Sequence, residues 1–317
     1  MTGELYIRQA TVQVANVIVR HEKDGDLRIR FRVTKNPWAT EPNKAHVTIY
    51  NLAPDRREIL NELVASGHVA RAPVIIEAGY KNATSIGVLG TIFKGSLRSV
   101  THSRDRGDWA TKIAAASFVS GPRDLSVNET YRGPNLTVGS IAVDLLKKIS
   151  KSVGGLDITE AVTRALSNDL SGVEQTLNKA VSVDGMGMDV LERLVSEHGF
   201  GVSEQDGKIR LIKYGERMGR SVKLSADSGL VGAVDPVTDA NRPGAFLIRA
   251  RSLLRHDIQI GTGVEIDSEA ISGLFVTEHL EHQGDVHGGS DSFITLIYGR
   301  GTSSEVQAVA DTGQEFA

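Results

Sequence analysis

The stretch Leu27–Val33 most constrains the fold, because apolar and charged residues alternate along it without exception. The alternation separates four apolar residues from three arginines: Leu27, Ile29, Phe31 and Val33 on one side, and Arg28, Arg30 and Arg32 on the other. Residues two apart share a face of a β-strand, so the pattern predicts a strand with an apolar inner face and a cationic outer face. The arginines can bind phosphate or an acidic partner, or form the solvated outer face of a sheet, which is the more common case.

Other short strands are predicted around this one. They are separated by turn residues and by one helix, Arg56–Leu63, which Pro54 precedes at a first helical position. The predicted strands are Ala45–Leu52, Val74–Tyr80, Gly87–Val100 and Trp109–Phe118. Strands this short and close favour a barrel or sandwich with one helix inserted.

The pattern changes to helical spacing near residue 135. Leu136–Ile149 is predicted as a helix that Thr137 caps, and Met188–His198 as a helix that Gly199 ends. Two further short helices and one hairpin complete this part: Ile158–Leu166, Val173–Val181, and the strands Phe200–Val202 and Lys208–Ile212 around Gln205-Asp206-Gly207. An Asp-Gly pair is typical of a tight hairpin turn.

Strand character returns after residue 220, and we predict an α+β fold that is mainly β. The β-forming segments are Ser228–Ala233, Ala245–Leu254, Val264–Ile266, and a hairpin of Ile271–Val286 and Ser292–Tyr298 that turns at Gly284-Asp285. The expected plan is a first β-barrel (residues 1–125), a helix and hairpin insert (126–219), a second, similar β-barrel (220–300) and a loose tail or docking arm (301–317).

Composition excludes several classes of protein. A chain of 317 residues favours two or three domains, and its net charge of −3 gives no global basic field for nucleic acid. The chain has no cysteine, so no disulfide framework holds it. We expect no signal peptide, because a basic region and an apolar core are missing after Met1, and no membrane insertion, because no apolar run is long enough.

The end of the predicted hairpin suggests a metal site at first sight. His279, His282, Asp285 and His287 lie close together in the sequence. Residues three apart point to opposite faces of a strand, so His279 and His282 do not converge, and no cysteine assists. We therefore predict a solvated lip of the hairpin, with no metal and no cofactor.

No catalytic constellation is found among the recognised motifs, and no catalytic residue is assigned. Gly185-Met186-Gly187 precedes a helix but lacks a third glycine and a preceding apolar strand. The acidic candidates have simpler roles: Glu192 and Glu197 do not share a helix face, Asp105 and Asp108 belong to a polar loop, and Asp184 and Asp189 suit a turn and a helix start. The chain is therefore not expected to be an enzyme.

Several phrases in order carry a resemblance that covers about residues 5–300. They are AHVTIYNLAPDRREIL (Ala45–Leu60), VIIEAGY (Val74–Tyr80), IFKGSLRSV (Ile92–Val100), WATKIAA (Trp109–Ala115), NLTVGSIAVDLLKKI (Asn135–Ile149), GMDVLERLVSEHGFGVSEQDGKIRLI (Gly187–Ile212), SGLVGA (Ser228–Ala233) and GLFVTEHLEHQGD (Gly273–Asp285). The chain resembles the baseplate hub proteins of contractile-tailed bacteriophages, which are related to the N-terminal part of type VI secretion spikes. It departs from the family at Ala53, where relatives often carry a Ser or Thr helix cap, and at the polar run Leu253–Ile258.

The resemblance implies a structural role in the virion. Each chain would hold two similar barrels, and a homotrimer would form a pseudo-sixfold ring that joins the sixfold tail tube to the threefold central spike. The implied partners are the tail tube protein, the spike protein, and possible tape measure and other baseplate proteins, while DNA passes through the channel without specific binding. The alternatives are a tail-associated cell-wall hydrolase with acids in the insert, and a spike of a type VI-like apparatus, which would need a long C-terminal β-helix.

Overall fold

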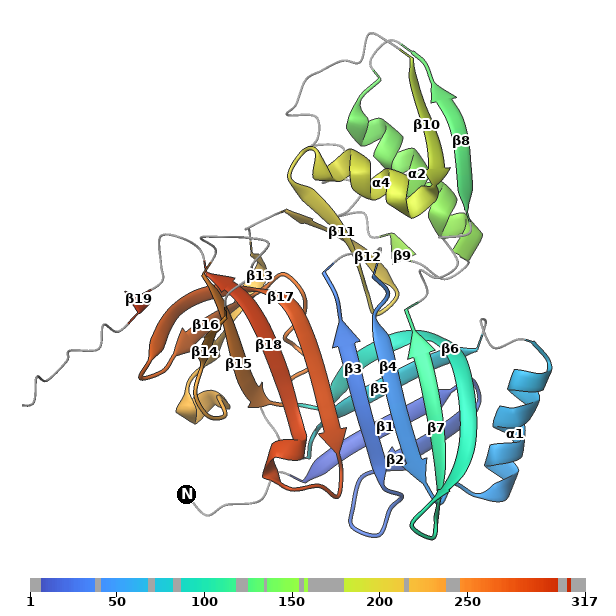
Figure 1. Cartoon of the computed structure of the whole chain (residues 1–317), viewed down its shortest axis with the longest axis vertical. Helices are drawn as coiled ribbons and strands as arrows, with labels where there is room; N and C mark the ends of the chain where they lie inside the picture. The colour runs from blue at the N-terminus through green and yellow to red at the C-terminus, as the bar shows by residue number, and fades with distance from the viewer. Residues whose placement is uncertain are drawn as a thin grey trace, which may run out of the picture.

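The computed structural model describes most of the chain in three spatial parts. The described residues are 7–37, 41–67, 72–81, 87–117, 125–133, 136–153, 157–158, 180–213, 217–237, 246–301 and 307–308. In Figure 1 a first β-rich unit lies at the lower right, a second at the left, and an insert of helices and hairpins lies above both.

The first β-unit holds seven strands and one helix. Its elements are β1 (Arg8–Val14), β2 (Val17–His21), β3 (Ile29–Lys35), β4 (Lys44–Tyr50), α1 (Pro54–Ala65), β5 (Pro73–Tyr80), β6 (Gly90–Asp105) and β7 (Asp108–Ala116). The predicted alternation is confirmed in β3, where Ile29, Phe31 and Val33 are buried while Arg30 and Arg32 are exposed. Helix α1 begins at Pro54, and Ala53 provides no side-chain cap.

The insert and the second β-unit follow in the chain. The insert comprises β8 (Ser126–Tyr131), α2 (Val138–Val153), β9 (Asp157–Ile158), β10 (Val181–Met186), α4 (Gly187–Ser196), β11 (Phe200–Gln205) and β12 (Lys208–Lys213). The second β-unit comprises β13 (Met218–Leu224), η4 (Ala226–Ser228), β14 (Asp235–Val237), β15 (Leu247–Leu253), β16 (Thr262–Asp267), β17 (Ile271–Asp285), η5 (Ser290–Ser292), β18 (Phe293–Gly301) and β19 (Gln307–Ala308).

One sheet of 14 strands runs through both β-units. Its main path is β14-β15-β18-β17-β3-β4-β7-β6-β5-β1-β2, and β13, β16 and β19 branch from it. The units meet where β17 pairs with β3 in antiparallel register, from Leu280 opposite Lys35 to Asp285 opposite Arg30. The mainly β class is confirmed. The expectation of two separate barrels is wrong in one respect, because the two β-rich segments share a sheet, and no pairing within the described strands closes either one into a barrel.

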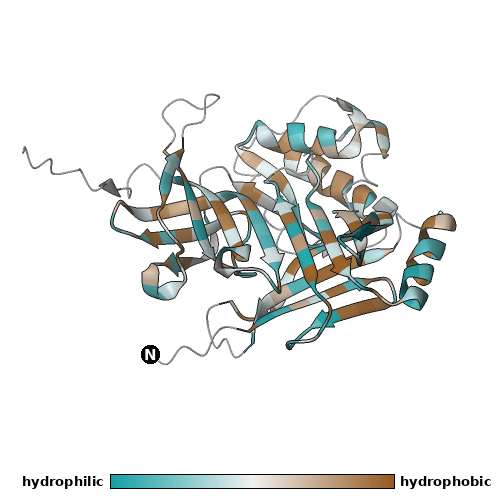
Figure 2. Cartoon of the chain, turned by 60° about the horizontal axis from the view of Figure 1, so that its bottom comes forward, coloured by the Kyte–Doolittle hydropathy of each residue, from teal (hydrophilic) through white to brown (hydrophobic). Residues whose placement is uncertain are grey.

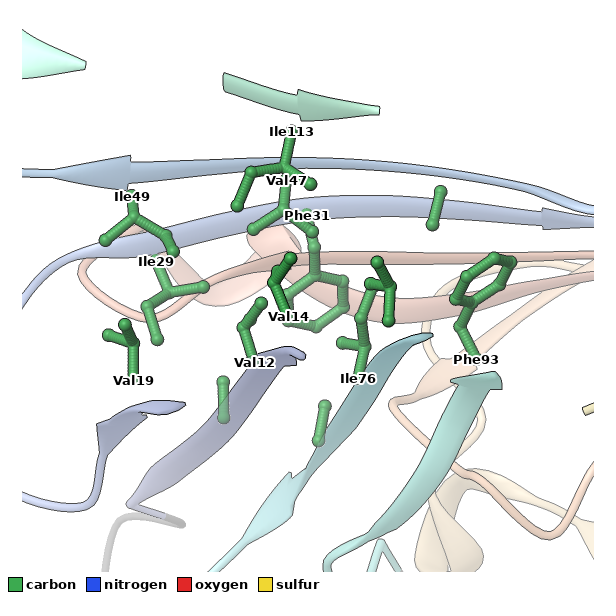
Figure 3. Packing of buried hydrophobic residues seen from close by; sticks show 14 of the residues in the cluster. Val12, Val14, Val19, Ile29, Phe31, Val47, Ile49, Ile76, Phe93 and Ile113 are labelled. Carbon is green, nitrogen blue, oxygen red and sulfur yellow. The ribbon is translucent and has the colours of Figure 1, made fainter. Parts of the chain in front are cut away.

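The sheet of the first β-unit folds over a single apolar core. Figure 3 shows Ile29, Phe31, Val47, Ile49 and Ile113 of β3, β4 and β7 packed against Val12, Val14, Val19 and Ile76 of β1, β2 and β5. Figure 2 shows apolar and polar residues alternating along many strands, as a sheet with one covered face requires. The second β-unit packs a separate core around Ile248, Phe275 and Leu280.

The two β-units repeat one arrangement of five strands. Strands β5-β6-β7-β4-β3 correspond in order and antiparallel pairing to β16-β17-β18-β15-β14. Each set contains one long strand with a register shift at the same point, after Leu97 in β6 and after Thr277 in β17. The correspondence can therefore be followed residue by residue across the strands.

The insert has its own small sheets and apolar cores. Strands β8 and β10 form one sheet, and β11, β12 and β9 form the other. The predicted cap of α2 is confirmed, because the Thr137 hydroxyl accepts from Ser140 N–H at 3.1 Å and the Ser140 hydroxyl accepts from Thr137 N–H at 3.1 Å. The predicted hairpin is confirmed as well, with positive φ angles at Asp206 and Gly207 in the turn between β11 and β12.

Some predicted elements differ from the structure or lie outside the described residues. The turn of the β17–β18 hairpin follows Asp285, since Gly284 is still paired with Phe293. Most of Ile158–Leu166 and Val173–Val181 lies outside the described residues, and the ends that are described, Ile158 and Val181, belong to strands. Within the predicted tail only Gly301 and 307–308 are described, and Ala308 of β19 pairs with Ile271 of β17.

Replacing Phe31 with alanine is expected to cost about 3–5 kcal/mol of unfolding free energy, because it empties a packed core site. Arg30→Ala is the matched control on the opposite face of the same strand and is expected to cost less than about 1 kcal/mol, since the Arg30 side chain is 55% exposed and Asp285 keeps its two hydrogen bonds from Arg28. Urea unfolding followed by circular dichroism measures both. A larger loss for Arg30→Ala than for Phe31→Ala would contradict these assignments.

Candidate functional site

Most of the polar and charged contacts between the parts of the chain gather at the seam, which is the pair of segments Arg30–Lys35 of β3 and Leu280–Asp285 of β17. Its two strands come from opposite ends of the chain. Both are interior strands of the sheet, because β3 also pairs with β4 and β17 also pairs with β18. The seam is therefore satisfied by backbone hydrogen bonds on both sides and differs from an exposed hairpin lip.

The inner face of the seam is closed by aromatic packing. Gly284 lies against the Phe31 ring, and a Cβ placed on Gly284 would lie 2.0 Å from a ring carbon. The Phe31 ring meets Phe293 edge to face at 5.7 Å, and Phe293 meets Tyr80 in the same way at 5.3 Å. A glycine is required at 284 for space, because any side chain there would displace the ring.

The outer face of the seam is held by ion pairs that join acids of β17 to Arg30 and Arg32 of β3 and to Arg28, which directly precedes β3. Arg28 donates two hydrogen bonds to the Asp285 carboxylate, at 3.0 and 2.6 Å, and Arg30 lies 3.3 Å from the same group. Arg32 binds Glu281 through two nitrogens, at 2.8 and 2.9 Å. The acidic partner of the arginine row is therefore supplied by the chain itself.

Asp285 is ionised under most conditions because of these partners. Burial pushes its pKa upward, but the hydrogen bonds from Arg28 and from the His287 N–H outweigh burial, and the pKa lies below its usual value. The Asp285 hydrogen bond in turn raises the pKa of Arg28. Paired hydrogen bonds of this geometry are among the stronger polar contacts in proteins.

Arg8, at the start of β1, fastens the turn beyond the seam. Its guanidinium donates to the carbonyl oxygens of Asp285, Gly288 and Gly289 at 2.8, 2.7 and 2.6 Å. The same group lies 5.5 Å from the centre of the Phe293 ring. One side chain of the first β-unit thus supplies the donors that the turn of the second β-unit needs.

The insert docks at the far end of the seam. The Lys35 ammonium, 1% exposed, lies 2.8 Å from the carboxylate of Asp206 in the β11–β12 turn. Asn43 donates to the Glu204 carbonyl at 2.6 Å, and the Gln205 amide donates to the Asn36 carbonyl at 3.2 Å. The tip of the insert hairpin is therefore bound to the first β-unit by buried polar contacts.

The predicted histidine lip is wrong for His282 and Asp285, which are buried. His282 is fully buried in the seam, where its Nδ1 lies 3.0 Å from the Thr295 hydroxyl. His279 packs its ring against Tyr298, and His287 packs against His21. Within the described part of the chain, no three His, Cys, Asp or Glu side chains gather as a metal site.

The His282–Thr295 contact is repeated in the first β-unit. His102 of β6 and Thr111 of β7 occupy the corresponding positions, and their Nδ1 to Oγ1 distance is also 3.0 Å. Burial lowers the pKa of both histidines, most strongly that of His282. The second nitrogen differs, because His102 Nε2 lies 3.1 Å from Asn61 Oδ1 of α1, whereas no described group pairs with His282 Nε2.

Of the acidic residues considered from the sequence, Asp105 and Asp108 lie directly opposite each other in the first β-unit, and the others lie in the insert. Asp105 and Asp108 flank the β6–β7 turn, where they accept hydrogen bonds from Tyr50 and Asn51, respectively. Asp189 lies in the first turn of α4, Asp184 lies in β10, and Glu192 and Glu197 belong to α4 and its C-terminus. The contacts found for Asp105 and Asp108 are structural.

An open depression lies over the seam, and the charged side chains that line it are already paired with one another or with neighbouring groups. Its volume is about 440 Å³, and it is lined by Arg30, Phe31, Arg32, His46, Thr48, Gln283, Gly284, Asp285 and Ser292. Its two arginines are already paired with Glu281 and Asp285. The arrangement therefore acts as a joint between parts of the chain.

The sequence did not lead us to Arg8, Lys35 or Asp206 as members of this joint. Only Lys35 could have been suspected, because it is a charged residue at a position of β3 where the alternation predicts a buried apolar one.

Removal of the Asp285 carboxylate tests the seam. Asp285→Ala leaves Arg28 and Arg30 without their acceptor and is expected to cost about 1.5–3 kcal/mol at pH 7. Asp235→Ala is the matched control: it breaks a pair with Arg249 in which both side chains are about half exposed, so the expected cost is under about 1 kcal/mol. Equal costs in urea unfolding would show that the Asp285 pairs are not structural.

Acid sensitivity should depend on His282. Above about pH 6.5 the imidazole is neutral in both states, and below it only the unfolded chain takes up the proton, so stability falls as pH falls. We expect His282 to lower the free energy of unfolding by about 1.4 kcal/mol for each pH unit below that point. His282→Gln should remove that slope, and His46→Gln, on the exposed face of β4, should retain it. Parallel stability curves for wild type and His282→Gln between pH 7.5 and 5.5 would contradict this assignment.

No model of a protein family matches the chain, and no curated protein matches it in sequence. In the part of the chain that the structure describes, no helix has the length and apolar character needed to span a membrane.

Solved structures do match, over nearly the whole chain. A tail protein from Neisseria meningitidis shares 11% of residues, with a TM-score of 0.57 over 93% of this chain and 97% of that one. The 43 kDa tail protein of prophage MuSo2 from Shewanella oneidensis shares 9%, with a TM-score of 0.57 over 92% and 98%. An E. coli type VI secretion component, described as structurally similar to the T4 bacteriophage tail proteins gp27 and gp5, shares 11%, with a TM-score of 0.57 over 92% and 77%. The chain therefore has the fold that phage tail proteins share with a type VI secretion component.

Proposed function

We propose that this chain is the structural hub of a bacteriophage tail baseplate. Three copies form a ring in the virion that joins the sixfold tail tube to the threefold central spike. The observation that carries the proposal is the repeat of five strands within one chain, joined into one sheet at the seam. Three chains with two repeats each present six similar units, which suits a junction between sixfold and threefold symmetry.

The division of labour within the chain follows its cores. Residues 1–125 and 220–300 form the two ring-building units, residues 126–219 form an insert that contacts other baseplate proteins, and residues 301–317 form an arm. Apolar clusters centred on the two β-units and on the insert support this division, and Leu254, Val286 and Phe293 of the second β-unit join the cluster of the first. The proposed partners are a tail tube protein, a spike protein and a tape measure protein; the fold shared with tail proteins supports the coarser point that the chain associates with other tail proteins.

The ring leaves a channel through which DNA passes without specific binding. The net charge of −3 supports this, since a strongly basic lumen would retain the nucleic acid. The ion pairs of Arg28, Arg30 and Arg32 with Asp285 and Glu281 act in the same direction, because they neutralise the cationic outer face of the seam. The role is structural, and the proposal assigns no reaction to the chain.

A second candidate is the hub part of a type VI-like secretion apparatus. The match to the E. coli type VI component favours it, since its TM-score and its coverage of this chain are similar to those of the tail proteins, although 77% of that component is covered. The two candidates differ in their partners: the phage hub is incorporated in a particle with a DNA-filled head, and the secretion hub is not. Purification of the chain from lysed cultures separates them, because only the phage hub co-sediments with DNA-containing particles.

Counting the copies in one ring tests the main proposal. Electron cryomicroscopy of the assembled baseplate should show three copies, each contributing two units to a pseudo-sixfold ring. Ring closure depends on mass action, so native mass measurements on the isolated protein should show a trimer that appears as concentration rises. Six copies of this chain in one ring would refute the trimer.

A further inference from the structure

The long strands β6 and β17 change neighbours halfway along, in the same manner. Up to its register shift, β17 pairs with β16, and beyond it Leu280–Asp285 pairs with β3. Up to its own shift, β6 pairs with β5, and beyond it Val100–Asp105 pairs with β7 on one side. Among the described strands, none pairs with the other side of Val100–Asp105. In the second repeat this edge of the long strand is covered by β3, whereas in the first repeat the corresponding edge of β6 is open.

The free side of β6 can be identified from the repeat. The Val286 N–H donates to the Ile29 carbonyl at 3.1 Å, so the backbone groups of even-numbered residues at this end of β17 point to β3. His282 corresponds to His102, as the matching contacts to Thr295 and Thr111 show. The backbone groups of Val100, His102 and Arg104 therefore point to the open side.

The complementary edge lies at the other end of the sheet. Strand β14 takes the place of β3 in the second repeat, and it pairs with β15 alone among the described strands. Following the register through β15 and β4, Asp235 corresponds to Arg32, Pro236 to Val33 and Val237 to Thr34. Strand β14, which corresponds to β3, therefore has a free side. Strand β6, which corresponds to β17, has one as well.

We propose that the open half of β6 in one copy pairs with β14 of the next copy, as β17 pairs with β3 within one chain. This proposal rests on the proposed ring and names the contact that builds it. Thr101 lies opposite the partner's Val237 and Ser103 opposite the partner's Asp235, in antiparallel register. The contact is head to tail, which is the kind of interface that a cyclic ring requires.

Two local features shape this contact. Pro236 has no N–H, so the joint has one hydrogen bond fewer than the seam, while the Pro236 carbonyl still accepts from His102 N–H. Helix α1 contacts β6 through Asn61 and His102. Thr101 and Ser103 lie on the opposite face of β6, because neighbouring residues of a strand point to opposite faces.

Introduced cysteines test the pairing without interference, because the natural chain has none. In the seam, Glu281 and Thr34 form a pair that is not hydrogen-bonded, and the corresponding positions are Thr101 and the partner's Val237. Such pairs bring Cα atoms within about 4.5 Å, which is inside the range that a disulfide spans. The double variant Thr101→Cys/Val237→Cys is oxidised at concentrations where the ring forms and is analysed on a non-reducing gel.

We expect covalent dimers and trimers from this variant, with a ladder that stops at three. A mixture of the single variants Thr101→Cys and Val237→Cys should give a covalent dimer between the two. Thr34→Cys/Glu281→Cys is the positive control and should close within one chain. Thr101→Cys/Arg20→Cys is the matched negative control, because Arg20 lies exposed on β2 at the other end of the sheet path.

The outcomes separate this inference from the proposed function. A trimer by native mass that gives no Thr101–Val237 cross-link, while the positive control closes, overturns the strand pairing and leaves the ring standing. A ladder that continues past three supports the pairing and overturns the threefold ring. A chain that remains monomeric at every concentration and in the baseplate overturns both.

Discussion

The pairing of β3 with β17 is the contact on which the rest of the structure depends. It joins residues 249 apart in the chain, as the Arg32–Glu281 bond shows, and it turns two β-rich segments into one sheet. Its inner face is apolar and its outer face is ionic, so a shift of one residue would place Phe31 in solvent and Arg30 in the core. The register is therefore specified on both faces at once.

The position of the insert depends on this register. Lys35 is the last residue of β3, and its buried ammonium is compensated by Asp206 at the tip of the insert hairpin. Breaking a buried pair leaves an uncompensated charge and is costly, although forming it adds little net stability. The pair thus disfavours other positions of the hairpin tip. The bonds from Asn43 and Gln205 fix the same tip from two further directions.

The repeat within the chain explains why similar residues have different surroundings. His102 and His282 hold corresponding positions and bond corresponding threonines, yet only His282 is fully buried. The difference arises because β3 covers the edge of β17, whereas no described strand covers the same part of β6. Unpaired strand edges are normally protected in soluble proteins, so such an edge in a protein with this fold is more consistent with assembly than with a free surface.

Local patterns were sufficient to predict many individual elements. The alternation of Leu27–Val33 predicted β3 and its faces, Thr137 predicted the start of α2, and Asp206-Gly207 predicted the turn of the insert hairpin. Each depends on residues a few positions apart, where spacing determines which side chains share a face. The ordered resemblance to hub proteins led to the fold that the structural matches support. Strands β1 and β2 were missed, although Val12, Val14, Val17 and Val19 alternate around a short turn.

The sequence by itself determined the mainly β class, the order of β-rich, helical and β-rich segments, and the absence of disulfides. Only the tertiary structure decided that the β-rich segments share a sheet, that Asp285 pairs with Arg28, and that His282 is buried. Strand pairing depends on which edges meet in space, and a strand covered on both sides loses the simple alternation from which burial is inferred. A histidine that would be solvated on an isolated hairpin is therefore buried once β3 lies beside it.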